Sequence, residues 1–243
     1  MARILRQSGL FIGTGLNESE DAWKLGDYSD RWINAYLSHA DEGSPDTERA
    51  MLADLASLLR EHCVGLNAGR PWGWKEPRSI YLLPFFHRHL PAVRFLHVVR
   101  DGRDMALSTN QNQLRKYGNS APIPFDLATP ARSIALWSWV NLKAAWYGEE
   151  HLGDRYLRIR FEDLCARPVE VTVDILSFFG LAGDPAVARD LVAVPTSLGR
   201  WRDESPEMIA LLEEHGGRAL GELGYERSVG VAGGRPSDRR VSS

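Results

Sequence analysis

The chain has 243 residues, of which 44% are hydrophobic and 25% are charged, and its formal net charge is −3. This composition favours one globular core and gives no overall signature of a nucleic-acid-binding or membrane-surface protein. Two cysteines without CxxC spacing exclude a recognisable zinc motif, and no run of about 18 apolar residues predicts a membrane span. We therefore expect a cytoplasmic protein without a metal, in which any anion site is a local cluster of arginine and lysine.

The first part of the chain predicts two helices, a short strand and a third helix. A short helix over residues 2–9 precedes a glycine-rich polar stretch. Apolar side chains at helical spacing predict a helix over 46–63, with Asp46 as its N-cap. The apolar run PWGWK, residues 71–75, predicts a strand. The helix that follows is expected to hold Pro84 near its first turn, because proline is poorly tolerated further inside a helix.

The clearest strand lies over residues 93–99, a nearly continuous apolar run typical of a parallel sheet covered on both faces. A helix over about 102–115 and a long helix over 131–150 follow it. Alternating residues predict a strand over 156–161. Further helices are expected over 162–181, 184–194 and 205–225. We expect one domain over residues 1–227 and a disordered tail over 228–243, which has no periodicity.

Alternating strands and helices predict an α/β fold with a doubly wound parallel sheet. In such folds, function concentrates at the carboxyl ends of the strands. Lys75 and Arg100 end two of the predicted strands, and Glu162 with Asp163 follows the third. Cations beside helix N-termini suit a phosphate or sulfate group. Taken alone, Arg100 is better explained by an ion pair with Asp101 or Asp104, because exposed charge runs usually form solvated faces.

Several separated segments resemble the sulfotransferases that use 3'-phosphoadenosine-5'-phosphosulfate (PAPS) as sulfuryl donor. They are WGWKEPRS (72–79), FLHVVRDGRDMALS (95–108), YLRIRFEDLCARP (156–168), SLGRWRDE (197–204) and LGELGY (220–225). The resemblance implies a sheet of the P-loop nucleoside triphosphate hydrolase type. It also implies transfer of a sulfuryl group from PAPS to a hydroxyl or amine of a small-molecule, carbohydrate or peptide acceptor.

The resemblance assigns roles to particular residues. Arg100 and Ser108 match the pair that binds the 3'-phosphate of PAPS, and Arg200 is a further expected phosphate contact. Lys75 matches the lysine that stabilises negative charge near the transferred group. Many relatives carry a histidine base two positions after this lysine, where this chain has Pro77. Glu18 is therefore the expected base, although a solvated carboxylate in a polar loop is the alternative.

The largest departure from the family lies at the start of the chain. Relatives begin with an apolar strand and a glycine-rich loop that holds the 5'-phosphate, followed by a helix into which Met1 falls here. We therefore expect a truncated chain whose sheet lacks its N-terminal central strand and exposes apolar surface at the gap. Such a chain would bind the product adenosine 3',5'-bisphosphate (PAP) poorly and be inactive.

Two other interpretations remain open at this point. The chain could be a non-catalytic binding or assembly module that retains only the 3'-phosphate half-site. It could also be a nucleotide kinase-like P-loop protein, although no GxxxxGK[ST] motif occurs. The sequence does not indicate the acceptor or the oligomeric state.

Overall fold

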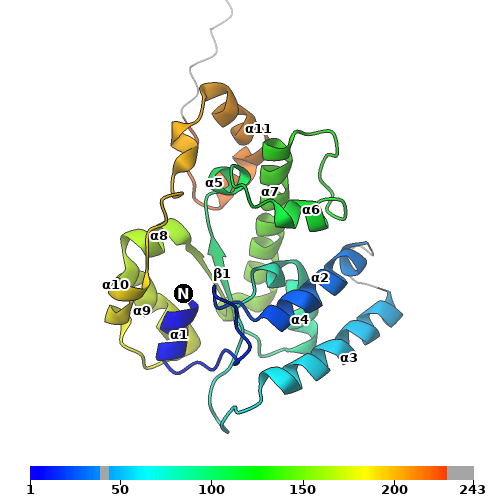
Figure 1. Cartoon of the computed structure of the whole chain (residues 1–243), viewed down its shortest axis with the longest axis vertical. Helices are drawn as coiled ribbons and strands as arrows, with labels where there is room; N and C mark the ends of the chain where they lie inside the picture. The colour runs from blue at the N-terminus through cyan, green and yellow to red at the C-terminus, as the bar shows by residue number, and fades with distance from the viewer. Residues whose placement is uncertain (39–43, 229–243) are drawn as a thin grey trace, which may run out of the picture.

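A computed structural model describes residues 1–38 and 44–228, with a parallel two-stranded sheet between groups of helices (Figure 1). Short 3-10 or π helices are labelled η. In chain order the elements are α1 (Ala2–Gln7), α2 (Trp23–Leu37), α3 (Pro45–His62), η1 (Pro77–Leu82), α4 (Leu83–His89), β1 (Phe95–Val99), α5 (Gly102–Ala106), α6 (Asn112–Tyr117), α7 (Thr129–Tyr147), η2 (Gly148–Leu152), η3 (Gly153–Arg155), β2 (Tyr156–Arg160), α8 (Phe161–Ala166), α9 (Pro168–Phe179), η4 (Pro185–Val187), α10 (Ala188–Leu191), η5 (Arg200–Asp203) and α11 (Pro206–Glu222).

The sheet confirms the predicted α/β class with parallel strands. β1 and β2 pair in register from Phe95 opposite Tyr156 to Val99 opposite Arg160. Within the described part of the chain, β1 has a neighbouring strand along one edge only. Val98, in the middle of the sequence's most apolar strand, is 39% exposed. Val98 is therefore an apolar side chain that remains partly uncovered on one face of the sheet.

The predicted strand over residues 71–75 was wrong in extent. Trp72 forms an isolated parallel bridge with Phe11, through which the Phe11 N–H bonds to the Pro71 carbonyl and the Gly73 N–H bonds to the Phe11 carbonyl. Proline has no N–H for a ladder, and glycine weakens a strand interior. The pairing consequently stops after one residue.

Helices cover the sheet from both sides (Figure 1). On one side, α1, α8 and α9 contribute to a cluster of apolar side chains that includes Leu5, Leu164 and Ile175. On the other side, α2, α3, α4 and α7 form the largest apolar cluster. The helices α5 and α11 both pack on α7 near the carboxyl end of β1. The elements thus bring the segment after β1 against the C-terminal part of the chain.

The predicted helix over 102–115 is instead two short helices with a turn between them. Helix α5 ends at Ala106, and α6 begins at Asn112. In the turn, the Asn110 N–H bonds to Ser108 Oγ, and Gln111 Nε2 donates to the Ser108 carbonyl. Polar side chains that bond to the local backbone compete with helical hydrogen bonds, which explains the interruption.

Two other differences concern helix starts. Ser44, rather than Asp46, caps α3 by accepting the Thr47 N–H. Helix α2 was not predicted, because its apolar residues are interspersed with Gly26, Ser29 and several charges.

The placement of Pro84 in the first turn of α4 is confirmed. The predicted tail over 228–243 lies outside the described residues apart from Ser228.

Gly102 lets α5 approach α7 closely. A Cβ atom at this position would overlap the ring of Trp137. The Trp137 Nε1–H also donates to the Arg100 carbonyl at 3.0 Å. The packing of Gly102 against Trp137 therefore helps to fix the end of β1.

We expect Gly102→Ala to lower the free energy of unfolding by about 1–3 kcal/mol, because the ring must move to accept an extra methyl group. Urea unfolding measures this change. Gly221→Ala is the matched control, since Gly221 lies in α11 with no neighbouring atom within 4 Å of an added Cβ. The control should be neutral or stabilising by up to about 1 kcal/mol. Equal stability of Gly102→Ala and the wild type would refute the packing argument.

His97 is a buried histidine of β1 whose two ring nitrogens are both hydrogen-bonded. It is 3% exposed, with Nε2 2.9 Å from Asn141 Oδ1 and Nδ1 2.7 Å from the Tyr156 hydroxyl. The Asn141 amide nitrogen donates to the Trp137 carbonyl, so its oxygen faces His97 and accepts from Nε2–H. Burial lowers the pKa of His97 from 6.5 to about 4.

The low pKa of His97 predicts acid sensitivity. As pH falls below 6.5, the unfolded chain binds the proton first, so stability declines from pH 6.5 down to about pH 4. The contribution of this one group is on the order of 3 kcal/mol. Urea unfolding at pH 7.5 and pH 4.5 should show a smaller difference for His97→Gln than for the wild type. Identical pH dependence in the two proteins would contradict this assignment.

Candidate functional site

Arg100 and Arg200 converge on one backbone carbonyl beyond the end of β1. Arg100 Nη2 donates to the Ser197 carbonyl at 2.5 Å and lies 3.1 Å from Ser197 Oγ. Arg200 Nε donates to the same carbonyl at 3.3 Å. The two predicted phosphate-binding arginines, 100 residues apart in sequence, therefore lie side by side at the carboxyl edge of the sheet.

Arg100 retains an unused donor. Its Nε is buried and has no hydrogen-bond partner among the described residues. A buried donor without a partner is costly, and a guanidinium group binds phosphate through two parallel N–H donors. The Phe161 ring lies 5.8 Å from the guanidinium carbon and covers one side of it. Arg100 thus has both the position and the free donor that an anion would require.

Ser108 lies in the turn after α5, rather than on a helix as predicted. Its hydroxyl accepts the Asn110 N–H at 3.2 Å. The neighbouring Leu107 carbonyl accepts Arg200 Nη1 at 3.5 Å. The turn that carries Ser108 is therefore next to Arg200, although its hydroxyl is engaged locally.

Buried charges lie beneath these arginines. Arg103, 2% exposed, forms a two-pronged ion pair with Asp101 and a second pair with Glu213 on α11 at 2.7 Å. Its guanidinium carbon lies 3.5 Å from the centroid of the Trp201 ring. Burial alone would raise the pKa of Glu213, but hydrogen bonds from Ser228 and the Arg103 charge bring it below its usual value.

Tyr225 fastens the C-terminal segment to the same edge. Its hydroxyl donates to Glu162 Oε2 at 2.9 Å and lies 3.2 Å from the Val99 carbonyl. Glu162 also accepts the Asp101 N–H at 2.9 Å. The acidic residue after β2 therefore satisfies backbone and hydroxyl donors at the ends of both strands.

Lys75 belongs to a second charged cluster, near α1. Its ammonium group donates to the Ser19 carbonyl at 3.2 Å and forms an ion pair with Asp21. The Lys75 carbonyl accepts the Ala22 N–H at 2.8 Å. The segment that carries the predicted base is thus tied to Lys75. Glu18 itself is exposed on the surface of this segment.

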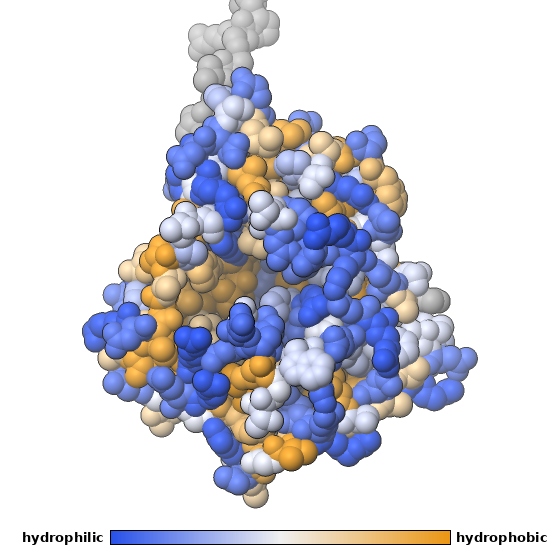
Figure 2. Space-filling view, in the orientation of Figure 1, coloured by the Kyte–Doolittle hydropathy of each residue, from blue (hydrophilic) through white to orange (hydrophobic). Residues whose placement is uncertain are grey.

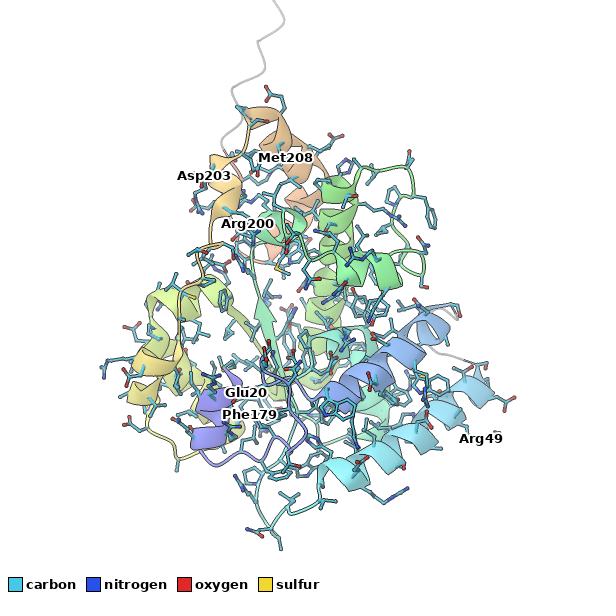
Figure 3. The ribbon with its side chains drawn as sticks, viewed as in Figure 1. Glu20, Arg49, Phe179, Arg200, Asp203 and Met208 are labelled. Carbon is cyan, nitrogen blue, oxygen red and sulfur yellow. The ribbon has the colours of Figure 1, made fainter. Side chains whose placement is uncertain are left out.

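Glu20 was not singled out by the sequence, yet it has the more unusual geometry. It is buried with a φ of 59°, the left-handed conformation that favours glycine. Its Oε1 pairs with Arg6 at 3.0 Å, whereas its buried Oε2 has no partner among the described residues. Figure 3 shows Glu20 beside α1 and Arg200 beside α5. Only the local ESED spelling could have suggested this position, and it does not distinguish the three carboxylates.

A hollow opens between these two clusters near the carboxyl end of β1, with apolar surface on the side of α8 (Figure 2). Among the described residues, Arg100–Asp101 connects β1 to α5, and β2 leads directly into α8. Neither junction is rich in glycine, so neither forms a glycine cradle for a 5'-phosphate.

Over the same ranges, no group of three or more histidine, cysteine, aspartate or glutamate side chains is arranged to hold a metal ion. No helix that the structure describes is both long and apolar enough to cross a membrane.

Comparison with known proteins identifies the family of this chain. The model of the sulfotransferase family matches residues 15–185, well over half of the chain. This chain is a member of the sulfotransferase family. The match includes Lys75, Arg100 and Ser108 and ends before Arg200. No curated protein matches the chain. As a member of this family, the chain belongs among enzymes that transfer sulfuryl groups.

Proposed function

We propose that this sulfotransferase uses PAPS as donor and transfers its sulfuryl group to a hydroxyl or amine of a small-molecule, carbohydrate or peptide acceptor. The observation that carries the proposal is the convergence of Arg100 and Arg200 on Ser197, where Arg100 Nε has no partner among the residues that the structure describes. The family match and the parallel sheet also support a doubly wound fold of the P-loop type.

In this proposal, the 3'-phosphate of the donor lies against Arg100, Arg200 and the turn that carries Ser108. The Nε of Arg100, which has no partner among the described residues, is the donor ready for this phosphate. The adjacent Nη2 now donates to the Ser197 carbonyl and to Asp104, and it would complete the planar pair of donors by exchanging Ser197 for the phosphate. Bound PAPS supplies the activated sulfuryl group. We assign no described residue to the 5'-phosphate, because neither strand-to-helix junction of the described sheet is rich in glycine.

Lys75 is proposed to stabilise the negative charge that develops during transfer, with Asp21 holding its ammonium group in place. The proton of the acceptor is proposed to pass to a carboxylate of residues 18–21. Glu18 is the choice by resemblance, whereas Glu20 has a carboxylate oxygen without a partner. Comparing the pH profile of turnover in Glu18→Gln and Glu20→Gln distinguishes the two.

Calorimetric titration with PAP and with adenosine 5'-monophosphate (AMP) tests the donor. Both carry a 5'-phosphate, but only PAP carries the 3'-phosphate that the arginines would bind. We expect PAP to bind at least about 100-fold more tightly than AMP, since each charge-assisted hydrogen bond contributes about 1.5–3 kcal/mol. This ratio does not depend on how weak the absolute affinity is. Equal dissociation constants would overturn the proposal.

Lys75→Ala is expected to lower kcat for sulfuryl transfer from PAPS by about 10²–10³-fold, the usual cost of losing one group that stabilises developing charge. PAP affinity should change little, because Lys75 lies in the cluster near α1 and not beside Arg100. Initial rates with radiolabelled PAPS over a panel of acceptors measure the effect. Arg49→Ala, at an exposed position on α3, is the control and should keep the wild-type rate. Unchanged kcat in Lys75→Ala would exclude this role.

A further inference from the structure

Asp104 lies at the junction between Arg100 and the segment that carries Arg200. Its side chain is 1% exposed. Oδ2 accepts Arg100 Nη2 at 3.0 Å and the Gly199 N–H at 2.7 Å, and Oδ1 accepts the Trp201 N–H at 3.2 Å. The Asp104 carboxylate therefore bonds to Arg100 and to the backbone on both sides of Arg200, which are the two arginines predicted to bind phosphate.

These contacts fix the shape of the loop as well as its position. Gly199 has a φ of 77°, and its N–H points at Asp104 while the preceding Ser197 carbonyl points at Arg100. Trp201 is held against Arg103 at 3.5 Å. Asp104 and Arg103 are adjacent in sequence, and both contact the backbone turn or the side chains of residues 199–201.

A carboxylate at this place has an electrostatic cost. The Asp104 carboxylate is buried, and burying a charge is costly. It would also repel the phosphate that the neighbouring Arg100 is proposed to bind. All three of its partners are donors, so a carboxylate satisfies them with two acceptor oxygens. An asparagine of the same shape would turn an NH2 group toward at least one of these donors. The loop geometry therefore requires the Asp104 carboxylate, although its negative charge is unfavourable beside a site for an anion.

We propose that Asp104 is a positioning residue for donor binding, which sets Arg100 and the Arg200 loop in their phosphate-binding geometry before the nucleotide arrives. This inference rests on the proposed use of PAPS. Asp104 does not touch the donor in this proposal. It acts through the guanidinium group of Arg100 and the N–H groups of Gly199 and Trp201.

The test is the ratio of the AMP and PAP dissociation constants in the wild type and in Asp104→Asn. General loosening of the fold weakens the binding of both nucleotides together and leaves this ratio unchanged. Displacement of Arg100 weakens the binding of PAP alone. We expect the ratio to fall by about tenfold or more. Glu213→Gln is the control, because Glu213 is also a buried carboxylate, 6% exposed, and contacts Arg103 and not Arg100. It should lose stability and keep the ratio.

An unchanged or increased ratio in Asp104→Asn would overturn the positioning role while leaving the use of PAPS intact. A ratio near one in the wild type would overturn the proposed donor, and the role of Asp104 with it. If Asp104→Asn does not fold, Asp104→Glu retains the charge but shifts the carboxylate by one methylene. Its ratio should fall in the same direction, and a wild-type ratio would count against the proposal.

Discussion

Arg100→Ala should abolish the preference for PAP over AMP. The substitution removes the guanidinium group whose Nη2 faces Ser197 and whose Nε has no partner within residues 1–38 and 44–228. Two charge-assisted hydrogen bonds contribute about 3–6 kcal/mol, so PAP affinity should fall by about 10²–10⁴-fold. Calorimetric titration of both nucleotides measures the change.

The AMP titration is an internal control for this variant, because AMP lacks the 3'-phosphate and should bind equally well to both proteins. Arg158→Ala provides a second control. Arg158 lies on the neighbouring strand β2 and pairs with Glu149 instead of Ser197. Its PAP affinity should match the wild type. Retention of a strong PAP preference in Arg100→Ala would remove the basis of the proposed donor site.

Arg103→Met should destabilise the fold more than any other substitution considered above. It leaves Asp101 and Glu213 buried without their cation, and breaking a buried pair from one side typically costs about 3–5 kcal/mol. The loss of the stacked guanidinium from Trp201 adds to this cost. Urea unfolding monitored by circular dichroism gives the free energy directly.

Arg202→Ala is a matched control, since Arg202 also lies over the Trp201 ring, at 4.6 Å, but is exposed. Its loss should cost no more than about 1 kcal/mol. If the two variants were equally stable, the ion pairs of Arg103 would have no net effect. That result would match the cases in which apolar side chains replace buried ion pairs without loss.

The sequence was sufficient where the relevant signal is local. A continuous apolar run identifies β1, and Arg100 follows it directly, so its place at the sheet edge needed no tertiary information. Gly180, with a φ of 65°, ends α9 close to the predicted helix end at residue 181, since glycine readily adopts the left-handed conformation. The predicted helix over 162–181 is nevertheless interrupted at Arg167, between α8 and α9. Arg200 came from resemblance alone, and its position beside Arg100 depends on contacts across 97 residues.

Other features could not be predicted because their causes are not local. The arrest of the PWGWK strand depends on a partner at Phe11 with which only one residue pairs. The turn at Ser108 reflects competition between side-chain and helical hydrogen bonds, which periodicity does not detect. The roles of Glu20 and Asp104 depend on which distant donors surround each carboxylate.

The segments that carry Arg100 and Arg200 are far apart in sequence, which affects when their contacts can form during protein synthesis. Arg100 meets Ser197 across 97 residues, and Val99 meets Tyr225 across 126. At a translation rate of about 5–20 residues per second, the first pair is separated by roughly 5–20 seconds on the ribosome. During that interval Arg103 and Asp104 have none of their partners from the later segments. The proposed donor site is therefore a late product of folding, and nascent chains that end before residue 197 should lack it.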